Sequence, residues 1–94
     1  MNFAIIYKPT RNNFLATMTA EEQQAIESHF NYLNELLKAD KLFMAGRCED
    51  ASFGVAIIDV SSEDEADTII DRDPAVASGV FEAELKQWRM ALTR

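Results

Sequence analysis

His29 and Asp73 are the two residues of this sequence best suited to moving protons. His29 is the only histidine, and an imidazole titrates near neutral pH, so it can both accept and donate a proton. Asp73 stands directly before Pro74. A carboxylate that accepts a hydrogen bond from one ring nitrogen would fix the tautomer and leave the other nitrogen for a substrate. If the fold brings the two together, they form a dyad for general acid/base catalysis.

Both residues also have an ordinary structural interpretation. A single histidine near the apolar face of a helix is more often a packing residue than a catalytic one. An aspartate before a proline is a common helix N-cap, with the proline in the first helical position. Capping occupies one carboxylate oxygen and leaves the other free, so a structural role for Asp73 is compatible with a chemical one.

Three further side chains are candidates for substrate binding. Tyr7 and Tyr32 could line a cleft, although a tyrosine at the edge of a core usually packs its ring and keeps its hydroxyl in water. Arg47 could bind an anion or form a surface ion pair. With one histidine and one cysteine, Cys48, a metal site would need scattered carboxylates, and no metal is expected. No phosphate-binding loop, nucleophile elbow or dinucleotide fingerprint is present, so the chemistry would be cofactor-free.

Size and composition limit the class of protein. The 94 residues predict one domain, 1–94, and the net charge of −7 argues against nucleic acid as a partner. A single cysteine excludes an internal disulfide framework. No apolar run is long enough to span a bilayer, and the start of the chain lacks the basic residues of a secretion signal. A cytoplasmic protein acting on a small molecule is the expectation.

The order of elements predicts an α+β, ferredoxin-like fold. Thr19 with Glu22, and Ser62 with Glu65, have the spacing of capping boxes and open two helices. Four apolar or alternating runs predict strands. The strands are expected over 3–7, 41–48, 53–60 and 80–90, and the helices over 20–40 and from Ser62 to about Ile70. The order βαββαβ implies a four-stranded antiparallel sheet with two helices on one face.

Two packing predictions follow from the apolar pattern. In the first helix, residues spaced by four, three and four predict the core stripe, which consists of Ile26, Phe30, Leu33 and Leu37. His29 lies in the adjacent row and is expected at the edge of the buried face. The first and third strands lack polar alternation, so both faces of the sheet centre must be covered. The helices cover one face, and a second subunit is expected to cover the other, giving a homodimer.

Three motifs give the sequence a family resemblance. They are Ser28-His29-Phe30-x-Tyr32-Leu33, Leu42-Phe43-Met44-Ala45-Gly46, and Asp73-Pro74-x-Val76-Ala77-x-Gly79-Val80-Phe81-Glu82 leading to Trp88. With the order of elements, they resemble the YciI-like (YCII-related) family of the dimeric α+β barrel superfamily. The resemblance implies an active site made of His29 and Asp73, and relatives that handle small chlorinated or lactone-type aromatic products. Ile26 replaces a basic residue of some members, so Arg47 or Arg11 would hold an anionic substrate.

Two hypotheses remain open from the sequence. The first is a cofactor-independent enzyme in which His29, oriented by Asp73, performs isomerisation or elimination on a small cyclic or aromatic metabolite. The second is a non-catalytic dimeric module that binds a small ligand or serves as an accessory protein. Replacement of His29 separates them, because it abolishes turnover in the first and leaves assembly intact.

Overall fold

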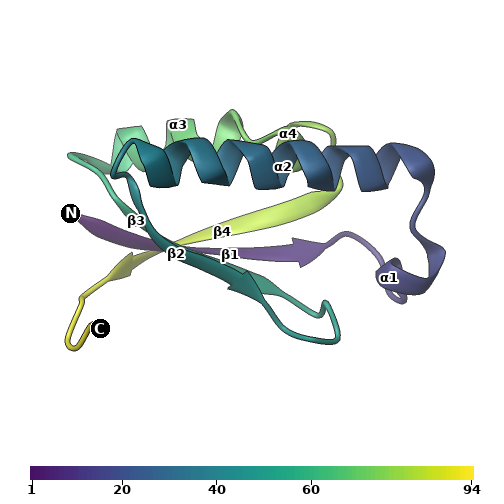
Figure 1. The fold of residues 1–94 in the computed structure, drawn as a ribbon, viewed down its shortest axis with the longest axis horizontal. Helices are drawn as coiled ribbons and strands as arrows, with labels where there is room; N and C mark the ends of the chain where they lie inside the picture. The colour runs from purple at the N-terminus through teal and green to yellow at the C-terminus, as the bar shows by residue number, and fades with distance from the viewer.

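A four-stranded antiparallel sheet covered by helices on one face forms the fold (Figure 1). The computed structural model describes residues 1–94. The strands are β1 (Asn2–Pro9), β2 (Leu42–Arg47), β3 (Gly54–Asp59) and β4 (Phe81–Trp88). The helices are α1 (Phe14–Thr17), α2 (Ala20–Lys38), α3 (Glu63–Asp71) and α4 (Pro74–Ala77). The strand order β2-β3-β1-β4 confirms the predicted α+β, ferredoxin-like arrangement. None of the helices is both long and apolar enough to cross a membrane.

The main core lies between the sheet and the two long helices. Alternate residues of the central strands, Phe3, Ile5 and Tyr7 of β1, point into it. They pack with the other buried side chains of this core, which are Leu33, Leu42, Ala56, Ile58, Val60, Ala66 and Ile69. Because both neighbours of β1 are antiparallel, Tyr7 lies beside Ala83 of β4 and Gly54 of β3. The register therefore fixes which end of the core Tyr7 occupies.

The predicted helix starts are confirmed in one case and half confirmed in the other. At α2, Thr19 Oγ1 accepts a hydrogen bond from the Glu22 amide at 3.1 Å, and the Glu22 carboxylate accepts from the Thr19 amide at 2.9 Å. At α3, Ser62 Oγ accepts from the Glu65 amide at 3.1 Å. The Glu65 carboxylate, however, accepts from the Ser61 amide at 2.8 Å and binds Lys41, so the reciprocal half of the box is absent.

The inward face of α2 differs from the predicted core stripe. Phe30 and Leu37 are 71% and 49% exposed, whereas His29 and Leu33 are buried. The prediction that His29 lies at the edge was therefore wrong, since it lies on the buried face. A period of 3.6 residues identifies an apolar stripe but cannot place its centre when two adjacent rows are both apolar. Here a buried polar partner of His29, described below, determines which row faces inward.

The connection between β1 and α2 also has structure that the sequence did not indicate. Phe14 folds back onto the body of the protein, in a small second cluster with Ala75 and Val80, whereas Leu15 is exposed. The one-turn helix α1 follows Asn13, whose backbone is in the left-handed region at φ 56°.

Candidate active site

The Asp73-Pro74 corner is built as the sequence predicts. Asp73 is the N-cap of α4, with Pro74 in the first turn, where its missing amide hydrogen costs nothing. Asp73 Oδ1 accepts a hydrogen bond from the Ala75 amide at 2.9 Å. The residue is completely buried, with 0% of its surface exposed. This cap therefore holds the carboxylate in one orientation inside the protein.

The second oxygen of this carboxylate contacts His29. Asp73 Oδ2 lies 2.6 Å from His29 Nδ1, so a residue of α2 and the corner before α4 are joined inside the fold. With Asp73 ionised, Nδ1–H is the donor, and the neutral ring then carries its lone pair on Nε2. Nε2 has no hydrogen-bond partner and, with the His29 side chain 11% exposed, is not sealed from solvent. The pair thus leaves one ring nitrogen free to exchange a proton.

Aromatic rings enclose the imidazole. The ring centroids of Tyr7 and Phe81 lie 5.0 Å and 5.4 Å from that of His29, both in edge-to-face geometry. Phe14 lies behind Phe81, at 6.1 Å between centroids. Such contacts fix the ring plane, and they limit the water around the His29–Asp73 pair. Sequence reasoning missed Phe81 as a neighbour of the site, although the alternation of β4 placed it on the strand's apolar face.

Tyr7 brings a second polar group to this site. Its hydroxyl is fully buried and makes no hydrogen bond within the protein. Burial, followed by the charge of Asp73 and by the close approach of the hydroxyl to that carboxylate, raises the pKa of Tyr7 above its ordinary value. The hydroxyl therefore stays protonated. It lies near Asp73, although its geometry falls short of a hydrogen bond. An unpaired buried hydroxyl carries a desolvation cost that no partner offsets.

The two tyrosines of the chain make a matched pair for testing whether the Tyr7 hydroxyl lacks a hydrogen-bond partner. Tyr32 Oη donates to the Ile69 carbonyl at 2.8 Å, whereas Tyr7 Oη has no partner. We expect Tyr32→Phe to lower the free energy of unfolding by about 1 kcal/mol and Tyr7→Phe to leave it unchanged or raise it slightly. Urea unfolding of the two variants measures the difference. A loss of about 1 kcal/mol or more in Tyr7→Phe would show that its hydroxyl is bonded in solution.

The remaining predicted substrate-binding residues, Arg47 and Tyr32, use their polar groups in contacts with the backbone. Arg47 donates to the carbonyls of Cys48 and Glu49, at 3.0 and 3.2 Å, within its own turn. Tyr32 uses its hydroxyl to join α2 to α3, although the charge of Asp73 adds to burial in raising the pKa of Tyr32. Their roles in substrate binding stay predictions.

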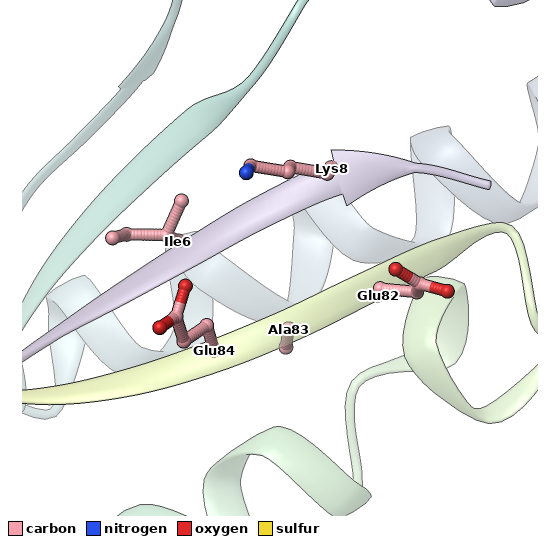
Figure 2. Close-up of a pocket in the computed structure, with 5 residues that line it drawn as sticks. All are labelled: Ile6, Lys8, Glu82, Ala83 and Glu84. Atoms are coloured by element: carbon pink, nitrogen blue, oxygen red, sulfur yellow. The ribbon is translucent and has the colours of Figure 1, made fainter. Parts of the chain in front are cut away.

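Two cavities lie near the site without including the dyad. One, of about 170 Å³, lies on the sheet face opposite the helices and is lined by Ile6, Lys8, Glu82, Ala83 and Glu84 (Figure 2). The other, of about 500 Å³, lies between the segment Lys8–Ala16 and the turn Asp50–Ser52. Neither is lined by His29 or Asp73.

Comparison with known proteins identifies the family. A model of the YCII-related domain matches residues 1–89. The chain belongs to the YCII-related domain family. This YCII-related domain is 35% identical over 78 residues to the uncharacterised protein YjpA of Bacillus subtilis (strain 168). The aligned region covers 81% of this chain and 92% of YjpA.

Solved structures share the fold of this YCII-related domain. One is 5-chloro-2-hydroxyhydroquinone dehydrochlorinase (TftG) of Burkholderia phenoliruptrix AC1100, in complex with 2,5-dihydroxybenzoquinone. It is 24% identical with a TM-score of 0.72, covering 97% of this chain and 96% of that one. The other is protein Atu4242 of Agrobacterium tumefaciens, 21% identical with a TM-score of 0.51, covering 97% and 94%. At these identities the likeness shows the fold.

Proposed function

We propose that this protein is a cofactor-independent enzyme in which His29 acts as general acid and base and Asp73 orients it. The observation that carries the proposal is the 2.6 Å contact between His29 Nδ1 and Asp73 Oδ2, with Nε2 unpartnered. A buried carboxylate that caps a helix and also binds a histidine is costly to maintain as structure alone.

The proposed chemistry is proton transfer at a small cyclic or aromatic metabolite. His29 Nε2 removes a proton from carbon or from a ring hydroxyl. In an elimination from a hydroxylated ring, the keto tautomer carries the leaving group on a tetrahedral carbon. The electron pair left by the removed proton then expels that group through the conjugated ring, and the proton remains on the imidazole until solvent takes it. In an isomerisation, the imidazolium returns the proton to another atom of the same molecule. Neither step requires a redox partner.

The solved structure most informative for choosing a substrate is the dehydrochlorinase, whose name describes an elimination of HCl. We therefore expect this protein to release chloride from 5-chloro-2-hydroxyhydroquinone or a related chlorinated hydroxyarene faster than buffer does. Chloride and the quinone product are followed together, because they form in equal amounts. Chloride release no faster than in buffer, across a series of such substrates, would contradict an elimination on this class of ring.

The non-catalytic alternative predicts a different role for His29. As a structural element, His29 would be needed for folding or assembly and not for any rate. A His29→Ala variant that fails to assemble, while any activity found persists per folded molecule, would favour a ligand-binding or accessory module.

We also propose that the protein is a homodimer joined through the sheet face opposite the helices. On that face, alternate residues of the central strands are apolar, namely Ala4, Ile6, Val55 and Ile57, and Met44 of β2 pairs beside Ile57. Met44 is 52% exposed. The outer strand β4 carries Glu82, Glu84 and Lys86 on the same face, where they would rim the apolar centre. A second copy of the chain would cover this surface.

Light scattering after size exclusion tests the dimer. We expect the wild type to have twice the chain mass of 10.6 kDa, and Met44→Glu to dissociate because it places a charge in the apolar centre. Phe30→Glu is the matched control, since Phe30 is 71% exposed on α2 and its replacement should leave the dimer intact. A monomeric wild type, or dissociation by Phe30→Glu alone, would contradict the proposed interface.

A further inference from the structure

The cavity of about 500 Å³ at the α1 end has the features of a ligand site separate from the dyad. It lies between the segment Lys8–Ala16 and the turn Asp50–Ser52, and it is called the α1 cavity below. Figure 1 shows α1 and the β2–β3 turn at the same end of the molecule. Its volume is in the range of sites that take small organic molecules.

Polar side chains without partners line the α1 cavity. Lys8, Asn12 and Asn13 border it. Their side chains are exposed to solvent and make no hydrogen bond or ion pair within the protein, although the Asn13 backbone carbonyl accepts from Thr17 at the start of α1. Arg11 also borders it, but its guanidinium binds the Glu22 carboxylate and the Thr17 carbonyl. The hydrogen bond from Arg11, followed by the one from the Thr19 amide, lowers the pKa of Glu22 to about 2. Lys8 is therefore the cation of the α1 cavity that forms no ion pair, although it also borders the smaller cavity beside Glu82 and Glu84.

One strained residue supports this interpretation. Of the three residues other than glycine with positive φ, Asn13 (56°) and Ala51 (60°) both line the α1 cavity. Asparagine adopts the left-handed region readily, whereas the region is unfavourable for alanine. Strain of this kind persists where the surrounding structure imposes it, often around binding sites. The turn that carries Ala51 thus forms one wall of the cavity at an energetic cost.

The opposite wall of the cavity is aromatic. Phe14 lines it and is buried, and its other neighbour is Phe81, which contacts the His29 ring at 5.4 Å between centroids. A flat ring against Phe14 would be separated from His29 by two aromatic rings, those of Phe14 and Phe81. Asp50 and Ser52 form the polar rim. Hydrogen bonds from Ser52 lower the pKa of Asp50, so Asp50 is ionised and can accept a hydrogen bond from a ligand.

We propose that the α1 cavity binds a small hydroxylated aromatic anion, with its anionic oxygen on Lys8 and the amides of Asn12 and Asn13, its ring against Phe14, and a hydroxyl donating to Asp50. A purely anionic ligand is disfavoured by the Asp50 charge, and a neutral ring forgoes the Lys8 contact. The further idea that this cavity admits the substrate of His29 and Asp73 rests on the proposed function. The binding of a ligand in the cavity does not depend on that function.

The test is an amide NMR titration with 2,5-dihydroxybenzoate. We expect saturable shifts confined to residues 8–16 and 50–52. Lys8→Gln should weaken binding by about tenfold or more, because a charge-assisted hydrogen bond is lost. Lys86→Gln is the matched control, since Lys86 lies on the same sheet face and pairs with Glu84, and it should bind within about twofold of the wild type. Benzoate should bind more weakly than 2,5-dihydroxybenzoate, and Asp50→Asn should remove that difference.

Several results would overturn the inference. They are shifts that lie outside the cavity, equal effects of Lys8→Gln and Lys86→Gln, no preference for the hydroxylated ligand, or no saturable binding at millimolar ligand. If the shifts centre on His29 and Tyr7 while Lys8→Gln binds normally, the α1 cavity is not the site and the proposed function stands. If the cavity binds as expected and the dyad variants lose no activity, the proposed function fails and the cavity stands.

Discussion

Replacing His29 by glutamine is expected to lower the rate of substrate turnover by about 10²- to 10⁴-fold, the range that general acid/base groups contribute. Glutamine is close to histidine in size and can still donate a hydrogen bond to Asp73, so the buried carboxylate keeps a partner. It cannot exchange a proton near neutral pH. The variant therefore removes the chemistry of the Nε2 position while it preserves the 2.6 Å contact at Nδ1.

Glu27→Gln provides the control for this measurement. Glu27 lies on the same helix and is exposed, so its replacement alters charge near His29 without touching the site. Turnover per folded molecule, with the folded fraction taken from urea unfolding, is the quantity to compare. A His29→Gln enzyme with the wild-type rate would show that the histidine packs α2 and does no chemistry.

Replacing Asp73 by asparagine is the second change with a large expected effect. The asparagine Oδ1 can accept from the Ala75 amide, so the cap of α4 survives. Its Nδ2 then faces His29 as a donor, which forces the imidazole to accept at Nδ1 and to carry its proton on Nε2. Because Nε2 is the nitrogen left for substrate, we expect activity to fall by about a hundredfold or more.

Two companion variants separate chemistry from stability. Asp71→Asn removes the same charge from an exposed position in α3 and should leave both rate and stability unchanged. Asp73→Ala removes the cap as well as the histidine's partner, and we expect it to lower the free energy of unfolding by about 3 kcal/mol. If Asp73→Asn were as destabilising as Asp73→Ala while its rate per folded molecule stayed normal, Asp73 would be structural.

The sequence predicted the sheet and the proximity of His29 and Asp73 for identifiable reasons. The runs around Ile5 and Ile57 lack polar alternation, and this pattern placed β1 and β3 at the centre of the sheet. Asp73-Pro74 is a local signal for a cap, so the corner could be predicted without tertiary information. The pairing with His29 rested on the family resemblance and on chemistry, and the structure brings the two residues into contact.

Other features depended on contacts that no local pattern contains. The orientation of α2 was mispredicted because Phe30 is the more apolar residue, yet His29 faces inward to meet the buried Asp73. The α1 cavity arises where two connections meet. Its left-handed residues, Asn13 and Ala51, are not glycines, so the usual signal for such backbone was absent. Only the three-dimensional arrangement shows that Lys8 lacks a partner there.

Nitrogen NMR of the imidazole through a pH titration tests the central claim most directly. His29 is the only histidine, so its signals need no assignment. We predict that Nδ1 stays protonated throughout, held by Asp73, while Nε2 takes up and releases the proton. Titration at Nδ1, or no titration at either nitrogen before the protein unfolds, would contradict the dyad.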